Sequence, residues 1–148
     1  MTHAEKAKQL FESGYNCAQA VMCAFSDVAG FNTEMSAKLA SSFGGGIGRL
    51  REVCGAVSAA EMILGLTQGY GVLDEGAVKK QHYARVRELA NAFVEKEGTY
   101  ICRELLKDVE TTPGGEPEAR TPEYYARRPC SRCVYEASEI LDSMLNKQ

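Results

Sequence analysis

The length, composition and charge of the chain limit what it can be. It has 148 residues, a hydrophobic fraction of 45% and a net charge of −3, which suits one globular helical domain spanning residues 1–148. This charge offers no basic field to attract nucleic acid or acidic lipid. The charged start and the absence of a long apolar run argue against a secretion signal and a membrane span. We therefore expect a cytoplasmic protein.

Apolar residues recur at helical spacing through most of the chain, and the alternation typical of strands is missing. This pattern predicts an all-α fold. A first helix is expected over residues 3–12, a second to about Val28 and a third to about Ser42. Good N-caps precede the second and third helices: Asn16, and Asn32 or Thr33.

A glycine-rich loop, Gly44–Gly48, separates these helices from the next one. A helix tolerates such a run poorly, and the run lacks the pattern of a phosphate-binding P-loop. Close backbone packing beside Cys54 is its expected use, although its N–H groups could also hold an anion or a thiolate. The next helix, from about Val53, is apolar or small all round except at Glu61. This composition predicts a central buried helix starting at Cys54.

Two more helices are expected in the second half of the chain. Asp74 can cap a long fifth helix to about Glu97, and Gly98 can end it. Its apolar stripe is expected to consist of Val78, His82, Val86, Leu89 and Phe93. Thr99 can then cap a short sixth helix.

An irregular segment precedes the last helix. Residues 109–123 hold three of the four prolines and two adjacent glycines, which predicts an exposed, mobile loop. The last helix is expected to begin near Pro122 or Pro129. The sequence thus predicts a bundle of about six helices.

Six cysteines are the main chemical feature of the chain. Structural disulfides are uncommon in a reducing compartment, so the alternatives are metal binding, redox chemistry, catalysis or inert buried thiols. Four of them begin predicted helices: Cys17, Cys54, Cys102 and Cys130. A helix N-terminus lowers the pKa of a thiol, and the thiolate is both the nucleophile and the metal ligand.

The order of the helices predicts where these thiols meet. Alternate helices of an up-down bundle start at the same end, so Cys17, Cys54 and Cys102 are expected to converge. Cys54 begins the central helix and has Arg49 and Arg51 nearby in sequence, so it should be the most reactive thiol.

Three other residues have weaker signals. Cys133 forms a CxxC with Cys130, which is typical of a disulfide-exchange pair or of half a metal site. Glu61 is two helical turns from Cys54 and is either a proton acceptor or a solvated carboxylate. Cys23 lies on a different face from Cys17, and we interpret it as incidental.

A series of short motifs accompanies the cysteines in a fixed order. They are GYNCAQAV, FGGGIGR, Cys54-Gly55-Ala56, ILGL, FVEKEG, CRELL and a final cysteine before VYEASEIL. Over roughly residues 10–145 they resemble the family of redox-active proteins named C_GCAxxG_C_C after its spaced cysteines. The resemblance implies that the family's four cysteines are Cys17, Cys54, Cys102 and Cys130, with Cys133 competing for the last place. Ala59 stands where the family motif closes with glycine.

We consider three functions, in order of preference. In a thiol redox protein, Cys54 would attack a disulfide or an oxidant, and Cys17 or Cys102 would resolve the product. In a metal protein, Cys17, Cys54, Cys102 and Cys130 (or Cys133) would bind an iron–sulfur cluster or zinc. In a structural or interaction protein, the thiols would be inert. The redox function implies a redox partner protein or a small thiol or disulfide as partner. The sequence is compatible with a monomer and with a homodimer.

Overall fold

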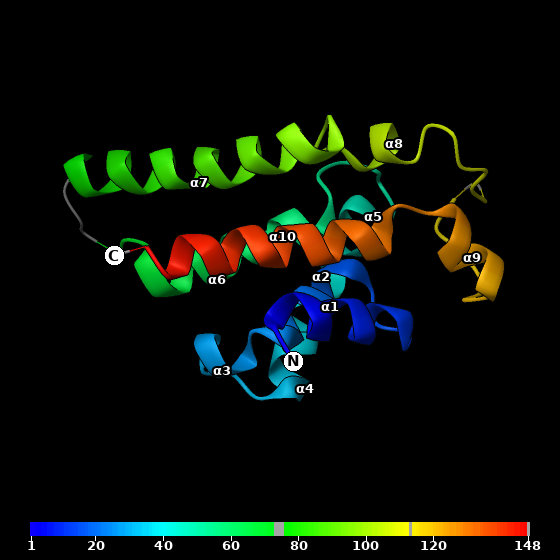
Figure 1. Cartoon of the computed structure of the whole chain (residues 1–148), viewed down its shortest axis with the longest axis horizontal. Helices are drawn as coiled ribbons and strands as arrows, with labels where there is room; N and C mark the ends of the chain where they lie inside the picture. Colours follow the sequence, from blue (N-terminus) through cyan, green and yellow to red (C-terminus); the bar gives the residue numbers. More distant parts are fainter. Residues whose placement is uncertain (73–75, 113, 148) are drawn as a thin grey trace.

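The structure is a computed structural model that describes residues 1–72, 76–112 and 114–147. Within these ranges the regular elements are helices, apart from one isolated antiparallel bridge between Val53 and Ile101. The predicted all-α fold class is therefore confirmed (Figure 1). None of the helices in the described ranges is both long and apolar enough to cross a membrane.

The helical elements are more numerous than the sequence predicts, while α1 has the predicted bounds. In chain order they are α1 (His3–Glu12), α2 (Cys17–Ala24), α3 (Ser26–Ala29), α4 (Thr33–Ala40), η1 (Ser41–Phe43), α5 (Gly44–Ile47), α6 (Gly55–Gln68), α7 (Gly76–Glu97), α8 (Cys102–Leu105), α9 (Pro122–Arg127) and α10 (Cys130–Leu145).

Side-chain caps fix the starts of the first helices. The side chains of Asn16 and Asn32 accept backbone N–H bonds at the first turns of α2 and α4, as expected. The predicted second helix is divided, because α2 ends at Ala24, with Phe25 as its C-cap, and α3 follows. At this break the Ser26 hydroxyl donates to the Cys23 carbonyl at 2.8 Å, a local bond that competes with a continuous helix.

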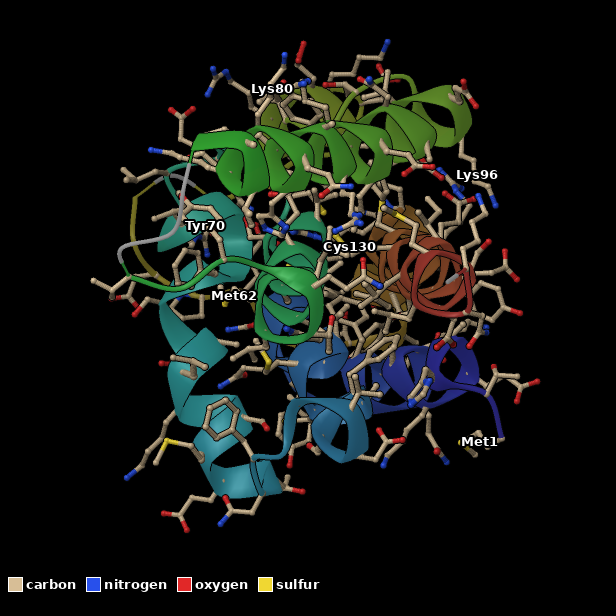
Figure 2. The ribbon with its side chains drawn as sticks, turned by 90° about the vertical axis from the view of Figure 1, so that its left-hand side faces the viewer. Met1, Met62, Tyr70, Lys80, Lys96 and Cys130 are labelled. Carbon is tan, nitrogen blue, oxygen red and sulfur yellow. The ribbon has the colours of Figure 1, made fainter. Side chains whose placement is uncertain are left out.

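Helix α6 is the centre of the bundle. It packs against α2, α7 and α10, while α1 packs against α2 and α10. Figure 2 shows α7 above α6 and α10, with α1 and α2 below them. Ala56, Ala59, Ala60, Ile63 and Leu64 are completely buried, as expected for a central helix. The helix itself begins one residue later than predicted, with Cys54 as its N-cap.

Helix α7 contributes one buried stripe to this core. His82, Leu89 and Phe93 are buried as expected, whereas Val78 is 44% exposed, because it lies near the start of the helix and beyond the core. The N-cap predicted at Asp74 lies outside the described residues. Gly98 follows the last turn with a φ of +87°, the left-handed conformation that commonly ends helices.

The segment between α8 and α9 is irregular, as predicted, and runs along the body of the protein. Arg120 donates to the carbonyl oxygens of Phe11 (3.3 Å) and Tyr15 (3.2 Å), and its guanidinium stacks on Tyr124. Both proline positions proposed for the last helix are used, since α9 begins at Pro122 and α10 follows Pro129. The mobility of residues 109–123 stays a prediction.

Candidate functional site

Five of the six cysteines line one cavity of about 310 Å³. They come from the starts of α2, α6, α8 and α10: Cys17, Cys54, Cys102, Cys130 and Cys133. The structure thus brings together the three thiols expected at one end of the bundle and adds both thiols of the CxxC. Cys23 lies elsewhere, buried with its Sγ 3.6 Å from the Thr33 carbonyl oxygen.

Backbone pairing holds Cys54 and Cys102 side by side. The N–H of Cys54 donates to the Tyr100 carbonyl at 2.8 Å, and the N–H of Cys102 donates to the Glu52 carbonyl at 2.6 Å. Helix α8 therefore starts at Cys102 with Ile101 as its N-cap, and the predicted cap at Thr99 is wrong. The Thr99 hydroxyl instead accepts the Ile101 N–H at 3.0 Å, beside the bridge, and donates to the Glu104 carboxylate of α8 at 2.8 Å.

Two glycines let the thiols approach the backbone closely. A Cβ atom at Gly55 would lie 2.6 Å from Cys17 Sγ, and one at Gly46 would lie 2.7 Å from Cys102 Cβ. Real Cβ atoms essentially never approach another atom this closely. The glycine-rich loop therefore packs closely, as the sequence predicts, but its Gly46 lies against Cys102 and not Cys54. Gly55, outside the loop, makes the close approach to Cys17.

The glycine-rich loop forms the distorted turn α5, in which Gly45 and Gly46 have non-helical φ and ψ, and the backbone from α5 to Arg51 is strained. Three residues with side chains have a positive φ, namely Ile47 (69°), Arg49 (67°) and Arg51 (62°), a region that such residues seldom adopt. Strain of this kind persists where the surrounding structure enforces it, and it is common at functional sites. It turns Arg49 and Arg51 toward the cavity that they line.

Cys54 differs from the other thiols in its protonation. A hydrogen bond from Cys133 lowers the pKa of the Cys54 thiol, and the backbone N–H groups of Ala56 and Val57 lower it further, against the opposing effect of burial. These N–H groups belong to the first turn of α6, where a negative charge is favoured. Cys54 is therefore the cysteine whose pKa is lowered, and its greater reactivity stays a prediction.

The remaining thiols of the cavity stay protonated. The hydrogen bond to Cys54 and burial raise the pKa of Cys133. Burial and the nearby Cys54 raise the pKa of Cys17, although a hydrogen bond from the Gly45 backbone opposes this, and they raise that of Cys130 to about 12. Burial also raises the pKa of Cys102. The site thus combines one thiol whose pKa is lowered with four whose pKa is raised.

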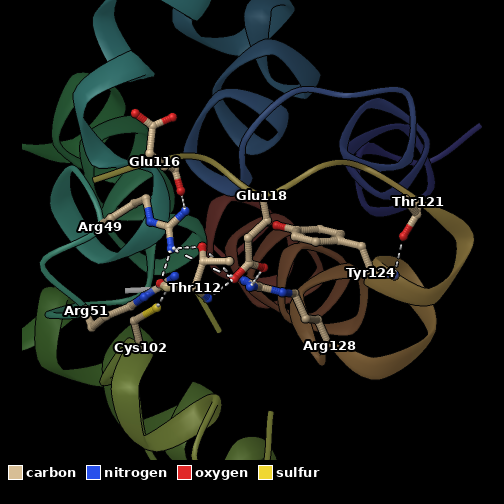
Figure 3. A network of polar contacts seen from close by, with 9 residues as sticks. All are labelled: Arg49, Arg51, Cys102, Thr112, Glu116, Glu118, Thr121, Tyr124 and Arg128. Atoms are coloured by element: carbon tan, nitrogen blue, oxygen red, sulfur yellow. Dashed lines mark hydrogen bonds and ion pairs between the residues drawn. The ribbon is translucent and has the colours of Figure 1, made fainter. Parts of the chain in front are cut away.

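Arg49 and Arg51 do not lie against Cys54, contrary to the expectation from the sequence. Arg51 Nη1 is 3.8 Å from the sulfur of Cys102, not directed at Cys54, and Arg49 binds Thr112 and Glu118 (Figure 3). The reason is the pairing between residues 51–54 and 100–103, which places Cys102 beside Arg51. Arg51 accordingly lowers the pKa of Cys102, in opposition to burial.

Glu97 and Glu136 form a carboxyl pair near the thiols, and the sequence does not identify this pair. The side chain of Glu97 is only 4% exposed and binds Arg132 through two bonds of 2.7 Å. These bonds lower the pKa of Glu97, while burial and the hydrogen bond to Glu97 raise that of Glu136 to about 7. The charge of Glu97 raises the pKa of both Cys54 and Cys133, so the pair is close to the reactive thiols.

Glu61 does not line the cavity. Burial raises its pKa to about 7. Within the described ranges, no group of three His, Cys, Asp or Glu side chains has an arrangement that could hold a metal ion.

The fold and the site together define an all-helical protein with a cavity of converging thiols. Comparison with known families then identifies the group: over residues 15–144 the chain matches the family described as putative redox-active protein (C_GCAxxG_C_C), and it belongs to that family. No curated protein and no solved structure matches the chain.

Proposed function

We propose that this protein is a thiol–disulfide oxidoreductase in which Cys54 is the nucleophile and Cys133 the resolving thiol. The observation that carries the proposal is the placement of the two thiols. Both line the same cavity, Cys54 as the N-cap of α6 and Cys133 near the start of α10, which packs against α6. In this arrangement Cys133 lowers the pKa of Cys54. The thiolate is the attacking species in disulfide exchange. Cys133 thus replaces Cys17 and Cys102 as the favoured resolving thiol.

The reaction needs two exchanges. The Cys54 thiolate attacks one sulfur of the substrate disulfide, forming a mixed disulfide and releasing one substrate thiolate, which takes up a proton. Cys133 then loses its proton and attacks the Cys54 sulfur, so that a Cys54–Cys133 disulfide forms and the second substrate thiolate leaves. Two electrons pass from the protein thiols to the substrate, and the reverse sequence restores the dithiol.

The carboxyl pair offers a place for the proton of Cys133. Glu97 is close enough to Cys133 to affect its pKa. Its neighbour Glu136 has a pKa of about 7, raised by burial and by the hydrogen bond to Glu97. A group that titrates near neutral pH is an efficient proton acceptor at that pH. In this proposal the pair takes the role that the sequence suggested for Glu61, because Glu97 is among the charges that shift the pKa of Cys54 and Cys133.

Disulfide mapping tests the proposal. The reduced protein is oxidised with 2-hydroxyethyl disulfide, blocked with an alkylating agent, digested and analysed by mass spectrometry. A bond between Cys54 and Cys133 is expected, and Cys133→Ser should instead accumulate the mixed disulfide on Cys54. Cys23→Ser is the matched control and should behave as wild type, because Cys23 lies outside the cavity. If Cys54 and Cys133 remain reduced while the folded protein is exposed to excess oxidant, the redox function is wrong and inert thiols are the better explanation.

A thiolate-ligated metal centre is the second candidate. It is favoured by the number of thiols, since an exchange pair leaves Cys17, Cys102 and Cys130 around the same cavity. As they stand, the side chains of the described ranges do not form a mononuclear site. Anaerobic purification with metal analysis and thiol counting distinguishes the two functions. Stoichiometric iron or zinc that protects four thiols supports the metal centre, and six free thiols in a reduced, metal-free protein support exchange.

A further inference from the structure

The cavity is strongly positive although the protein as a whole is negative. Four guanidinium groups line it, and among the described residues Glu118 is its only carboxylate. The four are Arg49, Arg51, Arg120 and Arg128. Even with Cys54 ionised, positive charges outnumber negative ones there, whereas the whole chain carries −3. A cavity of this kind concentrates anions.

Glu118 occupies the space between two of these arginines. Arg128 contacts one of its carboxylate oxygens, and Arg49 Nη2 lies 3.9 Å from the other (Figure 3). The three side chains are largely withdrawn from solvent, with exposures of 5% for Arg128, 13% for Arg49 and 15% for Glu118. A carboxylate supplied by the protein itself therefore already fills a carboxylate-binding position.

Glu118 does not occupy all the hydrogen-bond donors of the two guanidinium groups. The Nε atom of Arg49 is buried and has no hydrogen-bond partner. A buried polar group without a partner costs free energy, roughly 1–3 kcal/mol or more when charged. The pair of guanidinium groups can thus accept a ligand that makes more bonds than Glu118 does.

The size of the cavity indicates a small molecule. Its volume of about 310 Å³ is at the lower end of the range for small-molecule sites. Cys54 is 6% and Cys133 2% exposed, so a disulfide on the surface of a folded protein cannot reach them without rearrangement. A small disulfide can enter the cavity.

We infer that the substrate of the thiol site is a small disulfide that carries carboxylate groups, and that one carboxylate replaces Glu118 between Arg49 and Arg128. The inference rests on the proposed function and adds the substrate class to it. The disulfide bond then lies in the cavity with the Cys54 sulfur, and the exchange proceeds as described above. Glu118 returns to the two arginines when the thiol products leave. Arg49 and Arg128 therefore keep a carboxylate partner when no substrate is bound.

Three disulfides of similar size and different charge test the inference. They are 3,3′-dithiodipropionate (two carboxylates), 2-hydroxyethyl disulfide (neutral) and cystamine (two ammonium groups). Oxidation of Cys54 is followed under pseudo-first-order conditions, and each rate is divided by the rate of the same disulfide with 2-mercaptoethanol. We expect the dianion to react about tenfold or more faster than the neutral disulfide, and cystamine to be slowest. In 0.5 M KCl the differences should shrink several-fold.

Two charge-matched variants locate the effect. Glu118→Gln removes the internal carboxylate and should accelerate the dianion about three- to tenfold, a larger factor than for the neutral probe. Glu110→Gln removes the same charge from an exposed residue that does not line the cavity, and it should have no effect. Arg49→Gln should slow the dianion toward the neutral rate. Urea unfolding of each variant verifies that it is folded.

The outcomes separate the two proposals. If all three disulfides give equal normalised rates, or if cystamine is fastest, the carboxylate site is wrong while thiol exchange stands. The same holds if Glu118→Gln and Glu110→Gln accelerate the dianion equally, because the effect is then one of overall charge. If none of the probes yields a Cys54–Cys133 disulfide, the proposed function itself is wrong.

Discussion

Replacing Gly55 by alanine should destabilise the protein at the centre of the thiol cavity. The added methyl would lie 2.6 Å from Cys17 Sγ and 2.6 Å from the Phe43 carbonyl oxygen. Both contacts are about 0.8 Å shorter than an ordinary van der Waals contact of about 3.4 Å. Because one neighbour is backbone, the start of α6 must move. Overpacking of this kind costs about 1–3 kcal/mol, which corresponds to a decrease in Tm of about 3–10 °C for a chain of this length.

The matched control is the same substitution at Gly65, in the same helix. A Cβ there would meet only His82 Nε2, at an ordinary 3.9 Å, so the gain in helix propensity, up to about 1 kcal/mol, should raise the stability. Thermal unfolding followed by circular dichroism measures both variants under reducing conditions. The close packing of Cys17 against α6 is refuted if Gly55→Ala unfolds at or above the wild-type temperature while Gly65→Ala behaves as expected.

Three further predictions concern ionisation. Burial raises the pKa of Glu61 to about 7, so the wild type should lose stability relative to Glu61→Gln as pH rises from about 4.5 to 7, which urea unfolding at several pH values measures. A pH-independent difference would contradict this. Arg51→Gln should raise the pKa of Cys102 and slow its alkylation, with Cys54 unchanged, because Arg51 contacts the Cys102 sulfur. Cys133→Ala should raise the pKa of Cys54, whereas Cys133→Ser keeps a hydroxyl donor and should not; equal alkylation profiles would exclude the hydrogen bond as the cause.

Local signals predicted most of the helical framework. Asn16 and Asn32 are caps whose side chains bind backbone N–H groups within three residues, so their effect is visible in the sequence. The central position of α6 follows from its lack of a polar face, which only a buried helix can sustain. The errors at Thr99 and at the break after Ala24 occur where other bonds compete: the bridge between Val53 and Ile101 and the Ser26 hydroxyl.

The site itself could be predicted only in part. Chain order indicated that some of the cysteines converge. The expectation that a helix start lowers the pKa of its thiol holds for Cys54 alone. It is wrong for the other three helix starts, because burial raises the pKa of Cys17, Cys102 and Cys130. The contact between Cys54 and Cys133 depends on how α10 packs against α6, and no local pattern encodes that packing. The same is true of Glu97, which reaches the thiols from the end of α7, and of Glu118, which lies in a segment whose composition indicates only a loop.

The gathering of five thiols limits how many can ionise together. Each thiolate raises the pKa of its neighbours, and the charge on Cys54 does so for Cys17 and Cys130. A cluster that holds no cation is therefore restricted to about one negative sulfur near neutral pH. That restriction suits an exchange reaction, which needs one nucleophile and a protonated partner. A metal centre removes this limit on the number of thiolates. Bound thiols must all lose their protons, and the cation supplies the compensating charge. The number of protons released when the cavity is filled thus distinguishes the two chemistries: an anionic disulfide should release about one at most, and a four-thiolate metal site about three or four.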